Sequence, residues 1–285
     1  MTNLPPIVRT IKDLRTQVKV WKSEGLLIGL VPTMGALHRG HLSLVDEIAK
    51  KTDRIIVSIF VNPTQFGKDE DLEGYPRNES EDMEKLSTVS CHLVFAPDGA
   101  EMYPEGYQTS VHLEDITHGL EGAARPGHFD GMATIVSKLL NQSMPDMAIF
   151  GEKDYQQLQT IKRFVRDLDM DVKIIGSKLI REDDGLAMSS RNAYLNMDER
   201  IIAGQLNKIL KDLVQSVNTG ENLREAEARA TELLLEAGFT SVEYVSVRDA
   251  ENLNEITDIT RPARVLAVAC IGKIRLLDNM VINYN

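Results

Sequence analysis

Two histidines three residues apart, His38 and His41, follow a short apolar run and precede an amphipathic one. The residues that contain them, VPTMGALHRGH at 31–41, include a glycine suited to a tight turn. We therefore predict a strand, a turn and a helix whose first turn carries both imidazoles. The first N–H groups of a helix lack intrahelical partners and carry partial positive charge, so they bind phosphate. The pattern predicts a site for a nucleotide triphosphate.

Other readings of this histidine pair are less consistent with the sequence. The GxxxxGK[ST] spacing of a Walker A loop is absent. A zinc site would need a third His or Cys at supporting spacing, and none lies nearby in the sequence. The two cysteines, Cys91 and Cys270, are far apart and form no CxxC pair. We interpret both as packed or idle thiols, outside any disulfide scaffold or zinc site.

Polar clusters also follow two other predicted strands. The segment NPTQFG at 62–67 contains Gln65 and opens a polar stretch that runs to about Arg77. In GEKDYQQ, Lys153 and Asp154 open a helix whose next turn presents Gln157. Lysine supplies a mobile positive charge for a phosphoryl group, and glutamine can donate to and accept from a hydroxylated substrate. The alternatives are a solvated Gln65 in a surface loop and helix capping by Asp154.

Two further segments combine turn residues with cations. RPGHFDG at 125–131 precedes a helix predicted from residue 132, and it is either a cationic helix entrance or only a structural turn. DGLAMSSRN at 184–192 lies at a predicted domain junction and contains two hydroxyls followed by a guanidinium. Such a donor set can close on phosphates, although linkers are often rich in serine. We predict that this segment is a mobile lid ordered by the nucleotide.

The elements that must position these residues alternate between strand and helix up to about residue 176. The predicted strands are Leu27–Val31, Arg54–Val61, Leu93–Ala96, Met147–Phe150 and Val172–Ile175, and the helices lie near 42–51, 79–88, 132–142 and 155–168. This alternation favours an α/β fold with a doubly wound parallel sheet over residues 1–176. Helices near 198–217 and 222–237 and strands near 242–248 and 263–278 predict a smaller α+β domain over 177–285. Ligands of such sheets bind outside the carboxyl ends of the strands, where the polar clusters fall.

Composition limits the partners. The chain has 285 residues, of which 42% are hydrophobic and 26% charged, so it can bury a full core. A net charge of −11 disfavours a nucleic-acid partner, which needs a surplus of Lys and Arg. The sequence shows no apolar stretch long enough to span a membrane and no apolar signal-peptide region near its N-terminus. We therefore expect a cytoplasmic protein with no membrane partner.

Six ordered blocks resemble the pantothenate synthetase family, the ATP-dependent pantoate–beta-alanine ligases. The blocks, which lie within residues 32–192, are PTMGALHRGH, FVNPTQF, YPR, RPGHFDGM, GEKDYQQL and DGLAMSSRN. The resemblance implies a Rossmann-like domain of the nucleotidylyltransferase superfamily, with the HIGH-type turn and a KMSKS-like loop reduced to Met188-Ser189-Ser190-Arg191. It also implies that the smaller C-terminal domain forms a lid over the site.

The resemblance further implies the reaction and the residues that perform it. The carboxylate of pantoate attacks the α-phosphorus of ATP and releases pyrophosphate, and the amine of beta-alanine then attacks the pantoyl adenylate. His38, His41, Lys153 and Arg191 are the catalytic candidates, and Gln65 and Gln157 the candidates for binding pantoate and beta-alanine. The ATP-binding candidates are Met34, Gly35, His38, Gly40, His41, Gly151, Glu152, Lys153, Asp154, Ile180, Met188, Ser189, Ser190 and Arg191. Mg²⁺ is expected on the phosphates, with Asp82 contacting it through water, and the family implies a homodimer.

Other functions predict different behaviour. A small nucleotidylyltransferase of the same superfamily would transfer AMP to a phosphorylated substrate. A nucleotide-sensing module would bind ATP without turnover, and the two glutamines would then have no substrate. The acidic charge and the lack of an appended basic domain disfavour a tRNA synthetase.

Overall fold

The computed structural model describes residues 4–67 and 72–283. The chain forms two compact units, the first made of residues 1–152 and 160–177 and the second of residues 153–159 and 178–285. The second unit begins close to the sequence boundary at 176/177, but it also takes in residues 153–159, which the sequence places in the first domain. Part of the polar stretch after Gln65, at 68–71, and the chain ends at 1–3 and 284–285 lie outside the described residues.

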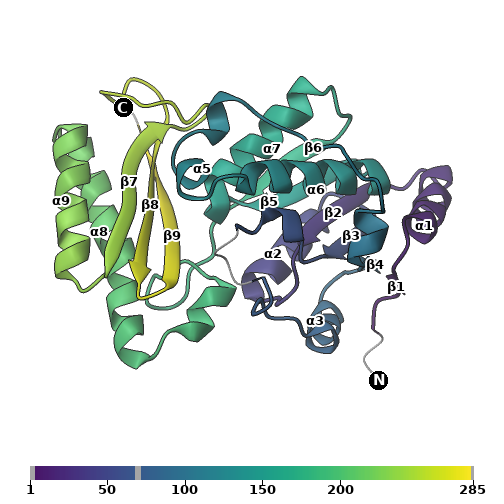
Figure 1. Cartoon of the computed structure of the whole chain (residues 1–285). Helices are drawn as coiled ribbons and strands as arrows, with labels where there is room; N and C mark the ends of the chain where they lie inside the picture. The colour runs from purple at the N-terminus through teal and green to yellow at the C-terminus, as the bar shows by residue number, and fades with distance from the viewer. Residues whose placement is uncertain (1–3, 68–71, 284–285) are drawn as a thin grey trace. The chain divides into compact units, whose positions relative to one another are not determined.

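The first unit contains a six-stranded sheet in which every pairing is parallel (Figure 1). Its order is β1-β4-β3-β2-β5-β6. The strands are β1 (Ile7–Val8), β2 (Ile28–Thr33), β3 (Arg54–Ile59), β4 (Leu93–Phe95), β5 (Met147–Gly151) and β6 (Lys173–Ser177). The chain runs outward from β2 to β3 and β4 and later returns to β5 beside β2. The order of the sheet therefore reverses between β2 and β5, which is where doubly wound sheets bind their ligands.

Helices connect these strands, as the alternating pattern predicts. They are α1 (Ile11–Ser23), α2 (Arg39–Ile48), α3 (Glu79–Leu86), α4 (Gly99–Met102), α5 (Glu121–Ala124), α6 (His128–Ser143) and α7 (Tyr155–Asp167). The sequence analysis missed α1, the four-residue helices α4 and α5 and the two-residue strand β1, and it began α2 three residues and α6 four residues late. Because α6 starts at His128, the segment 128–131 is its first turn and not the approach to it.

Burial of apolar side chains explains how β2, β3 and α2 pack in the first unit. The consecutive apolar residues of β2 and β3 lie inside, as expected for parallel strands covered on both faces. The amphipathic helix α2 turns Leu44, Val45 and Ile48 toward this sheet. Because α2 is packed along these residues, its N-terminus is held at the end of β2.

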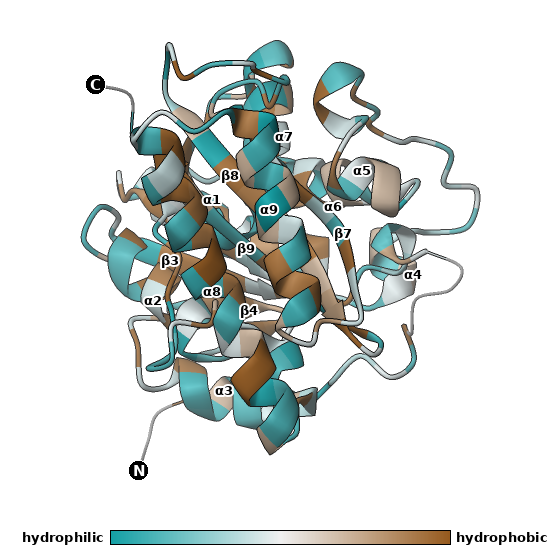
Figure 2. Cartoon of the chain, turned by 90° about the vertical axis from the view of Figure 1, so that its left-hand side faces the viewer, coloured by the Kyte–Doolittle hydropathy of each residue, from teal (hydrophilic) through white to brown (hydrophobic). Residues whose placement is uncertain are grey.

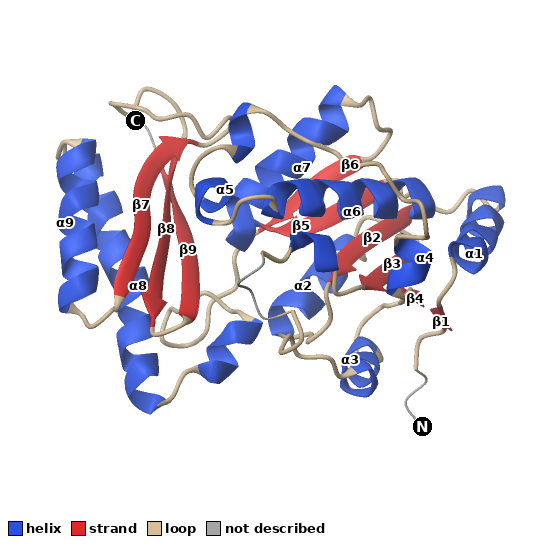
Figure 3. Ribbon diagram, in the orientation of Figure 1, coloured by secondary structure: helices blue, strands red, loops and turns tan. Residues whose placement is uncertain are grey.

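The second unit is a smaller α+β structure (Figure 3). It contains α8 (Met197–Asn218), α9 (Leu223–Glu236) and the antiparallel sheet β7 (Ser241–Asp249), β8 (Ala263–Ile271) and β9 (Ile274–Ile282). The single strand predicted over 263–278 is wrong, because a turn at Gly272, with φ +57°, divides it into the hairpin β8-β9. Such a backbone conformation suits glycine.

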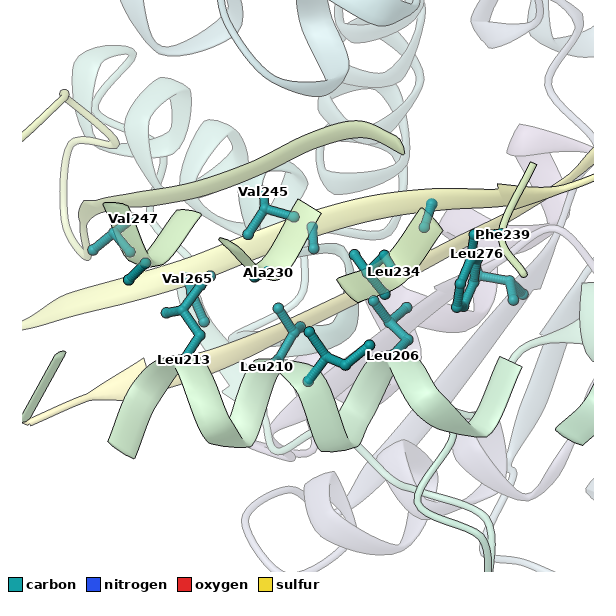
Figure 4. Close-up of a cluster of buried hydrophobic side chains, with 14 of the residues drawn as sticks. Leu206, Leu210, Leu213, Ala230, Leu234, Phe239, Val245, Val247, Val265 and Leu276 are labelled. Atoms are coloured by element: carbon teal, nitrogen blue, oxygen red, sulfur yellow. The ribbon is translucent and has the colours of Figure 1, made fainter. Parts of the chain in front are cut away.

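The core of this unit lies between the sheet and the helices α8 and α9. Leu206, Leu210 and Leu213 of α8 meet Val265 and Leu276 of the hairpin in the cluster drawn in Figure 4. Figure 2 shows hydrophobic and hydrophilic residues alternating along α8 and α9, as amphipathic helices require. Within the described residues, no helix combines the length and apolar character needed to cross a membrane.

Candidate active site

The start of α2 brings His38 and His41 together, as the sequence predicts. His38 is the N-cap residue and its Nδ1 accepts the N–H of Gly40 at 3.1 Å, while Nδ1 of His41 accepts the N–H of His38 at 3.3 Å. The ring centroids are 4.0 Å apart with an interplanar angle of 30°. Because a backbone N–H can only donate, both Nδ1 atoms are acceptors, and a neutral ring carries its proton on Nε2. Each imidazole is thus the tautomer that can donate through Nε2.

The turn before this helix has a backbone that few residues adopt. Gly35 has φ +82° and Ala36 has φ +50°, both in the left-handed region. A Cβ atom on Gly35 would also lie 3.0 Å from Oδ2 of Asp82. The site therefore requires glycine at position 35, and it stores strain at Ala36 that neighbouring contacts must offset.

Asp82 of α3 provides those contacts. Its Oδ2 accepts the N–H of Ala36 at 3.0 Å and its Oδ1 accepts the N–H of Leu37 at 2.7 Å. Lys85, one turn further on, donates to the carbonyl of Leu37 at 2.7 Å. Asp82 is only 2% exposed, and this burial raises its pKa, although the two N–H bonds act in the opposite direction. Asp82 and Lys85 thus hold, by hydrogen bonds, the main chain that leads to the two histidines.

This geometry bears on the metal expected from the sequence. Within residues 4–67 and 72–283, no group of three or more His, Cys, Asp or Glu side chains is placed to hold a metal ion. Both oxygens of Asp82 already accept hydrogen bonds, but each oxygen keeps a second lone pair. The donor set thus fits Mg²⁺ held mainly by phosphates and water, as is usual for this ion, rather than a metal caged by protein.

Gln65, in the short 3-10 helix η1 (Pro63–Gln65) after β3, is 8% exposed and fixed from three directions. Asn62 donates to its Oε1 at 3.2 Å, its Nε2 lies 2.8 Å from Sδ of Met34, and Nδ1 of His128 lies 2.8 Å from its carbonyl. A Cβ on Gly131 would lie 2.1 Å from the carbonyl oxygen of Thr64, so only glycine allows this approach. The segment 125–131 therefore supports Gln65.

Gly151 ends β5, and the 3-10 helix η3 (Glu152–Asp154) begins with Glu152. Since the strands are parallel, the ends of β2, β3 and β5 face the same edge of the sheet. At this edge of the first unit, Gly151 ends a strand, as predicted. The residues that follow the strands there, also as predicted, are Met34, Gly35, His38, Gly40, His41, Gln65 and Glu152.

The other candidates belong to the second unit. Lys153 and Asp154 lie in η3, and their side chains are 3.3 Å apart at Nζ and Oδ1, with the Lys153 side chain 18% exposed. Gln157 follows in the first turn of α7 and is partly buried. The lysine and the glutamine are thus one turn apart, as predicted.

The segment 184–192 is built on a small hairpin. Arg181 pairs with Ala187, the N–H of Met188 donates to the carbonyl of Ile180 at 3.0 Å, and Arg200 of α8 binds both Glu182 and Asp184 at 2.6 Å. Burial alone would raise the pKa of Asp184, but the hydrogen bonds from Arg200 and the N–H of Leu186 lower it below its ordinary value.

The serines and arginine follow this hairpin. Ser189 caps the 3-10 helix η4 (Ser190–Tyr194), accepting the N–H of Arg191 at 3.3 Å. Asn192 is 9% exposed and donates to the carbonyl of Ala187 and to Glu182. These contacts brace both ends of Met188–Arg191 in the structure, and the expected mobility of the segment remains a prediction.

The cysteines take no part in these clusters. Cys91 is partly buried and Cys270 buried, both as free thiols. Burial raises the pKa of Cys91 to about 12, and it also raises the pKa of Cys270. Such thiols are protonated at neutral pH and are poor nucleophiles.

Sequence reasoning missed several side chains that support the candidates. Asn62 and His128 hold Gln65, and Asn279 donates to the carbonyl of Lys153 at 2.9 Å. His128 appeared in the sequence analysis only as a cation at a helix entrance. A polar residue between apolar neighbours in a predicted strand region, as at Asn279, is a signal that the sequence did offer.

Comparison with known proteins gives consistent results. The family model described as pantoate-beta-alanine ligase matches residues 6–281. The pantothenate synthetase of Paramagnetospirillum magneticum is 53% identical over 280 residues, covering 98% of this chain and 99% of that protein. The crystal structure of pantothenate synthetase from Thermus thermophilus superposes with a TM-score of 0.90 at 40% identity, covering 98% of this chain and 100% of that one. A pantoate-beta-alanine ligase from Francisella tularensis, complexed with beta-gamma ATP and beta-alanine, gives a TM-score of 0.82 at 33% identity, covering 99% of each chain.

Proposed function

This chain belongs to the pantoate–beta-alanine ligase family, and we propose that it makes pantothenate through a pantoyl-adenylate intermediate. In the first step the carboxylate of pantoate attacks the α-phosphorus of ATP and pyrophosphate leaves. In the second step the amine of beta-alanine attacks the carbonyl carbon of the adenylate and AMP leaves. The Francisella tularensis relative, complexed with beta-gamma ATP and beta-alanine, supports two of the three substrates.

The observation that carries this proposal is the start of α2. A helix N-terminus and two imidazoles with Nε2 donors offer several hydrogen bonds to phosphate oxygens. Because pantoate brings its own carboxylate nucleophile, the reaction needs no nucleophilic side chain. The protein has to align the carboxylate with the α-phosphorus and stabilise the charge that grows on the phosphate oxygens.

The residues of the first unit divide between two tasks. We propose that His38 and His41 donate to the triphosphate, and that Gln65 binds pantoate through its side-chain amide. The remaining ATP contacts proposed for this unit are Met34, Gly35, Gly40, Gly151 and Glu152. Mg²⁺ bound to the phosphates would neutralise charge on the departing pyrophosphate, and Asp82 would contact it through water.

In the second unit, we propose that Lys153 and Arg191 place positive charge on the phosphates. Gln157 binds pantoate or beta-alanine. The other nucleotide contacts proposed here are Asp154, Ile180, Met188, Ser189 and Ser190. A lid function of this unit, a homodimer and a cytoplasmic location are proposals that rest on the family resemblance and on composition.

The proposal is tested by isotope exchange between pyrophosphate and ATP. We expect exchange with pantoate and Mg²⁺ in the absence of beta-alanine, because the adenylate forms before the amine reacts. A requirement for beta-alanine would contradict a separate adenylate step. Exchange that needs a phosphorylated substrate would indicate a nucleotidylyltransferase, and ATP binding without exchange would indicate a sensing module.

We expect Gln157→Ala to raise the Kd for pantoate by about 10–100-fold, because the lost amide leaves substrate oxygens without a partner. The Kd for ATP should stay within about twofold. Calorimetric titration of each ligand measures both constants. Gln215→Ala, the same change at an exposed position of α8, is the control and should alter neither. Lost ATP affinity with intact pantoate affinity would contradict the assignment of Gln157.

A further inference from the structure

Asp278 and Asn279, two buried polar neighbours on β9, connect the motifs of the second unit. Alternate residues of a strand face opposite sides of its sheet, so the two side chains point in opposite directions. Asp278 is 2% and Asn279 5% exposed. Burying polar side chains at two consecutive positions costs free energy unless both are satisfied by hydrogen bonds. Their partners therefore show what they do.

Asn279 is held in one orientation by a buried arginine. Arg264 of β8 is 6% exposed, and its NH1 donates to Oδ1 of Asn279. Its guanidinium carbon lies 3.8 Å from the ring centroid of Tyr155, while the Tyr155 hydroxyl donates to the carbonyl of Ala250 at 2.7 Å. Since the arginine can only donate, Asn279 must turn its oxygen toward Arg264 and its amide group the other way.

That amide group meets Lys153. Nδ2 of Asn279 donates to the carbonyl oxygen of Lys153 at 2.9 Å. The contact holds the main chain from which the long, flexible lysine side chain extends. Fixing this origin reduces the range of positions that Nζ can sample, and a displacement of about 1 Å can slow a reaction about 10²-fold.

Asp278 holds the second motif. Its two oxygens receive a two-pronged bond from Arg181, with NH1–Oδ2 at 2.7 Å and NH2–Oδ1 at 2.8 Å. NH1 of Arg181 also donates to the carbonyl of Gly185 at 2.9 Å, so the arginine closes the hairpin that leads to Met188–Arg191. Oδ1 of Asp278 accepts the N–H of Asn279 at 2.7 Å, which joins the two halves.

We propose that Asp278 and Asn279 are positioning residues that hold Lys153 and the Met188–Arg191 loop in register on the sheet of the second unit. The inference rests on the proposed function, because it assigns Lys153 a role in adenylate formation. Asn279 acts on that reaction through the lysine, and it is not itself a catalytic residue.

The test is a double-mutant cycle of Asn279→Asp and Lys153→Ala, measured as single-turnover adenylate formation. Asn279→Asp keeps an acceptor for Arg264 but turns a second oxygen toward the carbonyl of Lys153. We expect it to reduce the rate about 10–100-fold in the wild type and less than twofold in Lys153→Ala, since the lysine is then absent. Asn283→Asp makes the same charge change at an exposed position after β9 and should have no effect. Equal losses in both backgrounds overturn the inference.

Two further measurements separate the possible failures. If Asn279→Asp does not fold, Arg264→Met replaces it in the cycle, because it removes the donor that orients Asn279. Arg264→Met should likewise slow adenylate formation in the wild-type background and much less in Lys153→Ala. Hydrogen exchange of residues 152–156 should quicken in Asn279→Asp whatever reaction the protein performs, and unchanged exchange there also overturns the inference. Absence of pantoate-dependent exchange in the wild type would instead refute the proposed function.

Discussion

We expect His41→Ala to slow pantoyl-adenylate formation by about 10²–10³-fold, the usual effect of losing one preorganised donor to developing charge. Nδ1 of His41 accepts the N–H of His38, so a neutral ring carries its proton on Nε2, the atom that we propose as the donor to a phosphate oxygen. Such a bond strengthens as charge grows in the transition state, so the Kd for pantoate should change little. Rapid-quench measurement of a single turnover gives the rate.

Two conservative variants separate this role from capping. Asn places an oxygen close to the position of Nδ1 and can cap the N–H of His38, whereas Gln reaches the position of Nε2 and can donate there. His41→Asn should keep the thermal stability of the wild type and remain slow, and His41→Gln should regain part of the rate. Two results would assign His38 and His41 a structural role only. One is a loss of rate in His41→Asn that its loss of stability fully explains, and the other is a nearly wild-type rate of adenylate formation in His41→Ala.

The second large effect is expected at Asp82. Asp82→Ala leaves the partly buried N–H of Ala36 and the buried N–H of Leu37 without their acceptor, at a cost of about 1–3 kcal/mol each. The free energy of unfolding should therefore fall by about 2–6 kcal/mol, as measured by urea denaturation. Adenylate formation should fall by about 10²-fold, because the turn with positive φ at Gly35 and Ala36 then loses its support.

Magnesium titration distinguishes support of the turn from contact with the metal. If Asp82 acts through the backbone, raising Mg²⁺ should not restore the rate of Asp82→Asn, which keeps one acceptor oxygen and folds more readily than the alanine variant. Recovery at high Mg²⁺ would instead assign Asp82 to the metal. Asp46→Ala, at an exposed position of α2, is the control and should leave both stability and rate unchanged.

Much of the fold could be predicted because its signals are local. Apolar runs of four to eight residues bounded by turns predicted β2 to β6 to within two residues at each end, and amphipathic periods predicted α8 and α9 to within one residue at each end. The strand predicted over 263–278 failed because β8 and β9 are both largely apolar and only a two-residue turn separates them. Strand β1 is too short for any period to reveal it.

The candidate site divides in the same way. His38, His41, Lys153 and Arg191 stand out in the sequence because their types and spacing suit phosphate chemistry at a turn or a helix start. Their supports do not, because the contacts cross long stretches of chain. Asp82 reaches Leu37 across 45 residues, and Asn279 reaches Lys153 across 126.

By itself, the sequence determined the class of fold, the family and the residues with the chemistry to bind phosphate, since each depends on neighbours a few positions apart. Only the tertiary structure decided which atoms of those residues can donate, and which buried groups hold them. The imidazole tautomers follow from two backbone N–H groups at the start of α2. The main chain of Lys153 is held by Asn279 of β9, a strand close to the C-terminus. Hydrogen bonds depend on distance and direction in space, and the folded chain sets both.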